Sequence, residues 1–354
     1  MRKIASVELL RFISAISVMI WHYQHFYFPY NFFSEIEILA SSRDHQPFYY
    51  FISFFYNYGN RGVDFFFIIS GFVFAYVYLN ERKFTNLKVF FINRFARLYP
   101  LHFLTLIVIA LLQFYSDKNF NNYLIHIFND IYHFILNLFF VPAWGFEKGL
   151  SFNGPIWSVS VEIIVYFMFF FLIINIKKYR LLISTLIVFI FILSQKLFGD
   201  NFLNFINLNL INCIILFFEG VLVYYLSKKI RNQKYLFFLG LIFFAISVTG
   251  NVKFYALFPS ILLIFLSFEN FIIGRLSVFF SFLGNLTYGT YLWHVPIQII
   301  LMIILKINNY DWSIISSKVF FLIYLLTVFL TSIVSYFFYE RLTRNYLKKL
   351  YSNF

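Results

Sequence analysis

The chain has 354 residues, of which 61% are hydrophobic and only 12% are charged. A soluble globular domain carries about 25% charged residues, so this composition excludes an ordinary soluble domain. An excess of Lys and Arg over Asp and Glu gives a net charge of +13. The basic residues lie in short loops between apolar segments, which is the positive-inside pattern of a membrane protein and not that of a nucleic-acid surface.

Apolar segments follow one another from end to end, and most are long enough to cross a bilayer as helices. Their ranges are 4–28, 54–79, 98–115, 123–141, 155–176, 181–198, 208–226, 235–250, 254–268, 282–305 and 314–339. No loop between them is long enough to form a separate folded domain. The sequence therefore predicts an all-α, polytopic membrane protein in which residues 1–354 form a single domain.

Basic clusters between the segments indicate which loops are cytoplasmic. They begin at Arg2, Arg82, Lys177, Lys228, Arg275 and Arg341. If every cluster is cytoplasmic, the chain must cross the membrane an even number of times between consecutive clusters. Three candidate segments lie between the second and third clusters, so one of them does not cross.

Segment 123–141 is the one that we expect not to cross, because it is rich in polar residues. They are His126, Asn129, Asp130, His133 and Asn137. Such a set is costly in hydrocarbon but is tolerated in an interfacial or re-entrant segment. We predict about ten transmembrane helices plus this one segment, with both termini in the cytoplasm.

The first apolar segment carries three ionisable residues, Glu8, Arg11 and His22. Arg11 and His22 are eleven residues apart, about 1100° of helical rotation, which brings them within about 20° of one face. Glu8 precedes Arg11 by one turn and can pair with it. Either this face lines a polar cavity in which His22 acts chemically, or the charges merely neutralise each other. His25, about 300° further round than His22, should tolerate replacement.

The second segment begins with Arg61 and Asp64, which are three residues apart and can form an ion pair. Gly62 and Gly71 allow close approach to neighbouring helices. Taken alone, these residues are explained by helix packing and a local ion pair.

Arg94 and Arg97 lie three residues apart before Pro100, on the side predicted to be cytoplasmic. Two guanidinium groups on one helical face suit the capture of phosphate groups. They equally suit anchoring by the positive-inside rule, and the spacing does not decide between these roles.

Two more polar motifs occur within apolar segments. The first is Trp157-Ser158, followed by Glu162, whose carboxyl group needs a partner inside an apolar helix. The second contains Tyr291 and His294. His294 is a candidate for binding or catalysis, but it could equally be a hydrogen-bonded packing group.

The sequence lacks the patterns of other common catalytic sites. There is no Ser-His-Asp arrangement, no phosphate-binding loop, and no His or Cys spacing typical of a metal site. Cys213 is the only cysteine and lies in an apolar run, where a thiolate nucleophile is not expected. No metal and no permanently bound cofactor are therefore predicted.

These motifs together resemble those of the acyltransferase 3 family of integral-membrane acyltransferases, over nearly the whole chain. The matching elements are Arg11 with His22, Gly62-Val63-Asp64 through Ser70-Gly71, Arg94 through Pro100, Trp157-Ser158 through Glu162, and Tyr288 through Pro296. Each motif is weak singly, but five of them in order are specific. Thr287 stands where the family commonly has Ser.

The resemblance implies an enzyme of the bacterial inner membrane that transfers an acyl group, most commonly acetyl from cytoplasmic acetyl-CoA. The acceptor would be a hydroxyl of a glycan such as lipopolysaccharide O-antigen, capsule or exopolysaccharide. His22 would be the catalytic base, with Asp64 or Glu162 setting its tautomer. Arg94 and Arg97 would help to hold the CoA phosphates. The remaining candidates for binding substrate are Arg11, Arg61, Trp157, Ser158, Tyr291 and His294.

Two other classes of membrane protein are compatible with the composition. A glycan transporter or flippase would explain the spans and the intramembrane charges without chemistry, but such proteins usually contain internal repeats, and none is found here. A polysaccharide polymerase should carry a large outer loop, which is absent. Binding or hydrolysis of acetyl-CoA would separate a transferase from both.

Overall fold

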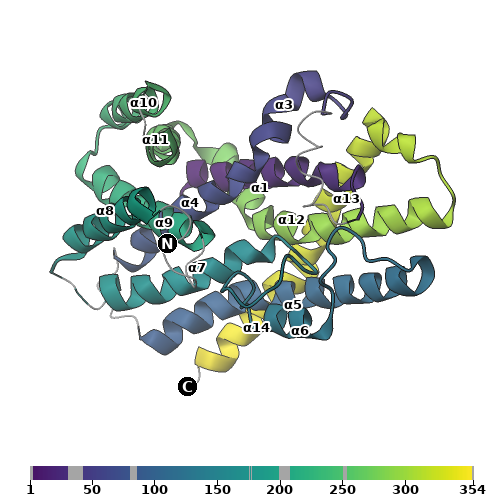
Figure 1. Cartoon of the computed structure of the whole chain (residues 1–354). Coiled ribbons are helices and arrows are strands. Elements are labelled where there is room, and N and C mark those ends of the chain that lie inside the picture. Colours follow the sequence, from purple (N-terminus) through teal and green to yellow (C-terminus); the bar gives the residue numbers. More distant parts are fainter. Residues whose placement is uncertain are drawn as a thin grey trace.

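The computed structural model describes residues 3–30, 43–79, 86–174, 176, 178–198, 208–249 and 253–352. Helices are the only regular elements in these ranges, as Figure 1 shows, so the predicted all-α class is confirmed. Eight of the helices are long and apolar enough to span a membrane, and two shorter apolar helices accompany them. Of the predicted basic clusters, Arg2, Arg82 and Lys177 lie outside the described residues.

The helices and short helical turns follow in chain order. They are α1 (Ala5–Trp21), η1 (His22–Phe26), α3 (Tyr49–Tyr58), η3 (Gly59–Arg61), α4 (Gly62–Tyr78), α5 (Leu87–Phe120), α6 (Ile131–Leu138), α7 (Ile156–Met168), η4 (Phe169–Ile174), α8 (Arg180–Phe198), α9 (Leu208–Lys229), α10 (Gln233–Thr249), α11 (Lys253–Ser267), η6 (Glu269–Phe271), α12 (Gly274–Ile307), η7 (Trp312–Ser316), α13 (Lys318–Ser335), η8 (Tyr336–Glu340) and α14 (Arg341–Ser352).

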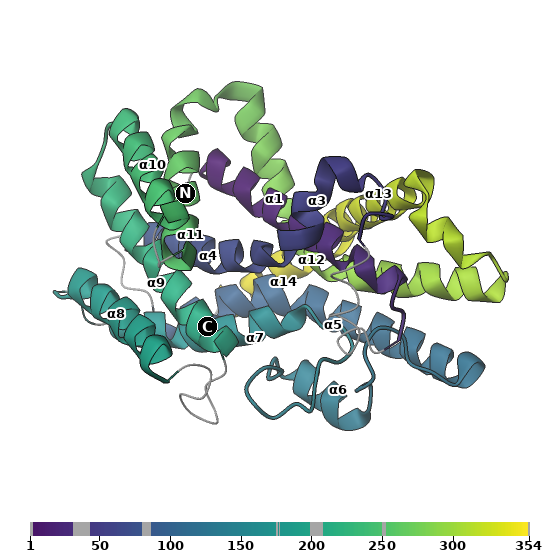
Figure 2. The ribbon, with the colours of Figure 1, turned by 45° about the horizontal axis from the view of Figure 1, so that its top comes forward.

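Helix α1 lies at the centre of the bundle, where it packs against both α4 and α12 (Figures 1 and 2). Helix α5 runs along one side of the bundle, and α14 packs against it. The marks for the N- and C-termini lie in the same half of both views. We call this end of the bundle the terminal end and the other the distal end.

The paired glycines of α4 lie at close helix contacts, as predicted. A Cβ atom added at Gly71 would lie 1.7 Å from the backbone oxygen of Phe217 in α9. One added at Gly62 would lie 2.5 Å from the backbone oxygen of Ser14 in α1. No larger residue fits at either position without separating the helices, so these glycines bring α4 close to both neighbours.

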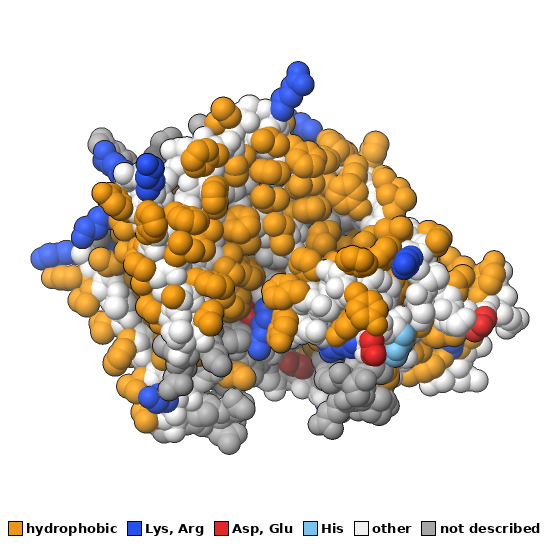
Figure 3. Space-filling view, turned by 90° about the horizontal axis from the view of Figure 1, so that it is seen from above, with side chains coloured by type: hydrophobic (Ala, Val, Ile, Leu, Met, Phe, Trp, Pro, Cys, Tyr) orange, Lys and Arg blue, Asp and Glu red, His pale blue; other side chains and the backbone are white. Residues whose placement is uncertain are grey.

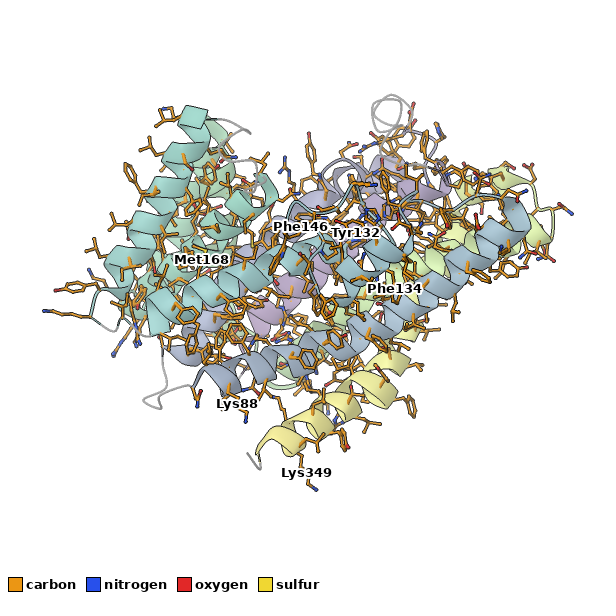
Figure 4. All side chains as sticks on the ribbon, turned by 60° about the horizontal axis from the view of Figure 1, so that its bottom comes forward. Lys88, Tyr132, Phe134, Phe146, Met168 and Lys349 are labelled. Carbon is orange, nitrogen blue, oxygen red and sulfur yellow. The ribbon has the colours of Figure 1, made fainter. Side chains whose placement is uncertain are left out.

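The segment between α5 and α7 does not cross the bundle, which confirms the prediction for residues 123–141. Its helix α6 has eight residues and is about 12 Å long, far short of the roughly 30 Å of bilayer hydrocarbon. Its polar side chains have hydrogen-bond partners: Asp130 accepts from the backbone N–H of His133 at 2.9 Å. Figure 4 shows Tyr132 beside Phe146, where its hydroxyl donates to the backbone oxygen of Phe146.

The outer surface of the bundle is apolar over large areas. Large hydrophobic side chains such as Phe189, Leu197 and Phe338 are more than 60% exposed. Figure 3 shows apolar side chains over most of the face seen there, with charged groups chiefly toward its margins. A surface of this kind is suited to lipid contact, and this chain is a multi-pass membrane protein.

Candidate active site

Two cavities lie end to end inside the bundle. The inner cavity, nearer the terminal end, has a volume of about 90 Å³. The outer cavity, nearer the distal end, has a volume of about 490 Å³. The phenol ring of Tyr291 contributes to the walls of both cavities.

The inner cavity is lined by three of the predicted arginines, Arg11, Arg94 and Arg97. Arg11 pairs with Glu8 at 3.2 Å, which confirms the predicted i, i+3 ion pair. The Arg94 guanidinium lies 4.4 Å from the ring centroid of Phe74, a cation–π contact that holds it against the cavity wall. Positive charge is therefore concentrated around a narrow space.

Glu162 also lines the inner cavity, where it accepts a hydrogen bond from the hydroxyl of Tyr166 at 2.7 Å. Its other carboxylate oxygen has no hydrogen-bond partner among the residues that the structure describes. A buried acceptor of this kind can receive a hydrogen bond from a bound ligand. The structure places Glu162 among the arginines and not beside His22.

His22 lines the outer cavity and is positioned by the last turn of α1. Its Nδ1 atom lies 2.9 Å from the backbone oxygen of Val18. A carbonyl oxygen only accepts, so Nδ1 carries the proton and Nε2 keeps its lone pair. The prediction that Asp64 or Glu162 sets the tautomer is therefore wrong, because the backbone carbonyl of Val18 in the last turn of α1 does so.

His22 belongs to a group of histidine rings at the distal end of α1. Its ring centroid lies 4.8 Å from that of His294 and 5.0 Å from that of His25. Gln298 donates from Nε2 to the backbone oxygen of His22 at 2.7 Å and accepts from His25 Nδ1 at 2.8 Å. One amide of α12 thus fixes two of these residues.

His25 lies closer to His22 than α-helical spacing predicts. Helix α1 ends at Trp21, and residues His22–Phe26 form a 3₁₀ helix. With three residues per turn, positions i and i+3 lie directly above each other. His25 is 1% exposed and lies beside His22, so it is unsuitable as a surface control.

His126 reaches the same cavity from the segment between α5 and α7. Burial lowers the pKa of His126 to about 4, so its imidazole is neutral at physiological pH. A Cβ atom at Gly154 would lie 2.3 Å from His126 Nε2, so a larger residue there would displace the His126 ring. Sequence reasoning noted the polarity of this segment but missed His126 as a site residue.

The polar groups opposite His22 carry both signs of charge. Asp64 and Arg61 form the predicted i, i+3 pair at 3.5 Å, and both line the outer cavity. Lys148 also lines it and was not among the predicted site residues. Trp157 presents its indole to the same space.

Ser158 and Tyr291 lie at the junction of the two cavities. The two hydroxyl oxygens are 2.8 Å apart, and the Tyr291 hydroxyl donates to the backbone oxygen of Pro155 at 2.8 Å. Helix α7 therefore presents Trp157 to the outer cavity, Ser158 to the junction and Glu162 to the inner cavity. One motif serves both spaces.

The structure brings the predicted site residues together along one line through the bundle. The inner cavity contains Arg11, Arg94, Arg97, Ser158, Glu162 and Tyr291; the outer cavity contains His22, Arg61, Asp64, Trp157 and Tyr291. His294 lies behind His22 and is fully buried. Over the ranges that the structure describes, no group of three or more His, Cys, Asp or Glu residues could hold a metal ion.

A family model described as an acyltransferase domain matches residues 4–340. No curated protein and no solved structure gives a significant match. The matched region contains both cavities and every predicted site residue. This chain belongs to the acyltransferase 3 family of membrane acyltransferases.

Proposed function

We propose that this acyltransferase transfers an acetyl group from cytoplasmic acetyl-CoA to a hydroxyl of an exported glycan, such as O-antigen, capsule or exopolysaccharide. The observation that carries the proposal is that Tyr291 lies in the walls of both cavities. A thioester that reaches the end of the inner cavity therefore meets a hydroxyl bound in the outer one.

The inner cavity suits the donor. Coenzyme A is a polyanion attached to a thin, uncharged pantetheine arm, and its phosphates cannot enter lipid. Arg94 and Arg97 would bind phosphate oxygens at the terminal end, where Arg97 also faces the open cavities beyond. The narrow space past them admits only the arm.

The outer cavity suits the acceptor. Its volume of about 490 Å³ is within the usual range of small-molecule sites, roughly 300–1,000 Å³. Trp157 provides an apolar face for a sugar ring, and Asp64, Arg61 and Lys148 provide hydrogen-bonding groups for its hydroxyls. A carbohydrate, which combines apolar ring faces with many hydroxyls, matches this lining.

His22 acts as the general base in the proposed reaction. Its Nε2 atom takes the proton of the acceptor hydroxyl while the hydroxyl oxygen attacks the thioester carbonyl carbon. The C–S bond then breaks, the acetyl group remains on the acceptor oxygen as an ester, and the thiolate leaves. The imidazolium returns its proton to that thiolate, so coenzyme A is released as the thiol.

Family membership favours this enzyme over the transporter or flippase that composition alone allows. We place both termini in the cytoplasm of a bacterial cell and the distal end toward the periplasm, on the basis of the loop charges. In a Cys213→Ser background, new cysteines at Asp117 and Lys148 should both be labelled from outside. Labelling of both from the cytoplasmic side would contradict this orientation, and labelling from opposite sides would mean that residues 123–141 cross the membrane.

The purified protein in lipid nanodiscs provides the test of function. We expect it to bind acetyl-CoA and to hydrolyse it slowly when no acceptor is present. Mass spectrometry of the surface glycan, with and without the gene, should show a gain of one acetyl group per modified sugar. A protein that ignores acetyl-CoA would disprove the donor assignment.

A further inference from the structure

The terminal end holds a third space whose lining is basic. This space, which we call the basic pocket, has a volume of about 350 Å³. Its polar lining consists of Tyr78, Asn93, Arg94, Arg97, Arg344 and Lys348. No Asp or Glu among the described residues lines it. Arg94 and Arg97 also line the inner cavity, so the two spaces share a wall.

A neighbouring cavity of about 310 Å³ offers a contrast. It shares Arg97 and Arg344 with the basic pocket, but Glu8 and Glu340 also line it. There the positive charge is partly neutralised by the protein itself. The described lining of the basic pocket contains no carboxylate, and Lys348 lies close enough to Arg344, Arg94 and Arg97 for their charges to repel its own. A bound polyanion would relieve this repulsion.

Helix α14 supplies two of these cations through one of its faces. Arg344 and Lys348 are four residues apart and therefore neighbours on the helix surface. Leu342, Tyr346 and Leu350 form another row at the same spacing, with exposures of 58%, 65% and 44%. Apolar and basic faces on one helix are typical of a helix lying in the membrane interface.

The position of α14 is set by helix α5, which carries Arg94 and Arg97. The two helices pack against each other. Figure 4 shows Lys88 at the start of α5 and Lys349 near the end of α14 on the same side of the molecule. The basic face of α14 and the arginines of α5 thus converge on one space from two sides.

We propose that α14 completes the donor site, with Arg344 and Lys348 binding the 3′-phosphate of the CoA nucleotide. This inference rests on the proposed function. The diphosphate is attached directly to the pantetheine arm, so it must lie at the mouth of the inner cavity, beside Arg94 and Arg97. The 3′-phosphate is further from the arm. It would therefore be bound by Arg344 and Lys348, which line the basic pocket but not the inner cavity.

The proposal predicts that the enzyme distinguishes two donors that differ only in the 3′-phosphate. Acetyl-CoA engages all four cations, whereas acetyl-3′-dephospho-CoA leaves Arg344 and Lys348 without a ligand. Charge-assisted hydrogen bonds to a phosphate should favour acetyl-CoA by about tenfold or more in KM.

The experiment measures KM for both donors with the full-length protein in nanodiscs. The Arg344→Ala/Lys348→Ala double variant should lose the preference, because its KM for acetyl-CoA rises about tenfold. Its KM for acetyl-3′-dephospho-CoA should stay unchanged, and this also shows that the variant is folded. Arg341→Ala and Lys349→Ala remove the same charge from the same helix outside the basic pocket and should keep the preference. Lys348→Gln, at an exposed position, should give part of the loss.

Three results would overturn the proposal. The double variant could still use acetyl-CoA and keep the full preference for it over acetyl-3′-dephospho-CoA. The proposed function would then be retained, and the role of α14 in donor binding would be disproved. Equal rises in KM for both donors would place the effect on the fold or on the shared part of the donor. A wild-type protein that uses neither donor would remove the proposed function as well.

Discussion

The inner and outer cavities meet at Tyr291 but are built from different chemistry. The inner cavity is narrow and lined by arginines, whereas the outer cavity is about five times larger and carries both signs of charge together with an indole. A narrow cationic space selects a thin anionic ligand by charge. A wide space of mixed polarity selects by the pattern of hydroxyls and ring faces. The difference supports the proposal that donor and acceptor are recognised independently.

This independence makes a mutational comparison possible. Substitutions in the inner cavity should change the KM for the donor, and those in the outer cavity should change the KM for the acceptor or the rate of transfer. A substitution that raised both KM values equally would contradict independent recognition, because it would indicate a single site shared by donor and acceptor.

The largest effect is expected for His22→Ala. Loss of the general base should reduce glycan acylation by about 10²–10⁴-fold, measured as kcat with a purified acceptor. Acetyl-CoA binding should be retained, because His22 lines the outer cavity, whereas Arg94 and Arg97, the proposed phosphate ligands, line the inner one. The pair of measurements tests whether the two cavities act separately.

His45→Ala is the matched control for His22→Ala, because His45 is exposed and lies outside both cavities. It should leave acylation within twofold of wild type. His294→Ala distinguishes the two candidate bases, since these rings are in contact. Full activity in His22→Ala together with loss in His294→Ala would transfer the role of base to His294.

A smaller effect is expected for Arg97→Ala. Arg97 lines both the inner cavity and the basic pocket. Loss of a charge-assisted hydrogen bond to phosphate should weaken acetyl-CoA binding by about 1.5–3 kcal/mol. The KM for the glycan should not change. Isothermal titration with acetyl-CoA provides the measurement, and Lys349→Ala provides a control with the same loss of charge. Unchanged affinity in the folded variant would leave membrane topology as the role of this arginine.

The next effect in size is expected for Trp157→Ala. Loss of the indole face should raise the KM for the acceptor by several-fold, corresponding to about 1 kcal/mol of ring contact. Acetyl-CoA hydrolysis in the absence of acceptor should continue at the wild-type rate. Trp157→Phe keeps an aromatic face and should recover most of the affinity. A rise in the KM for acetyl-CoA instead would place Trp157 in the donor site.

Much of this arrangement could be predicted from the sequence because membranes make polar residues informative. Arg11, Asp64 and Glu162 stand out in apolar helices, and hydrocarbon tolerates such groups only where they face a cavity or a partner. The charge count also indicated that one of three segments does not cross, and the polar residues of 123–141 identified which one. These inferences need only composition and spacing.

Other parts could not be predicted because they depend on where helices end. The change from α-helix to 3₁₀ helix at His22 turns His25 by about 60° relative to its α-helical position and brings it onto the face of His22, and the sequence contains no proline or glycine at that point to signal it. The same local geometry places Nδ1 of His22 beside the backbone oxygen of Val18, and this contact sets the tautomer of His22. Arg344 and Lys348 are far from the other site residues in sequence, so only the packing of α14 on α5 brings them close.

The smallest effect is expected for Asp130→Asn, which tests whether the segment carrying His126 only supports the outer cavity. Asp130 caps α6, and the hydrogen bond from the backbone N–H of His133 holds the pKa of its carboxyl group below the usual value, assisted by the His133 ring. A carboxyl group with a depressed folded-state pKa stabilises the protein above its unfolded pKa. The contribution disappears as pH falls through the folded-state value.

Asp130→Asn should therefore lower the unfolding temperature slightly at pH 7, and the difference from wild type should shrink below about pH 4. Asn is itself a good N-cap, so a change well below 1 kcal/mol is expected. The KM values for donor and acceptor should be unchanged, because Asp130 lines neither cavity. A clear rise in the acceptor KM would show that the segment itself shapes the acceptor site, and the outer cavity would then depend on a region that the inner cavity does not need.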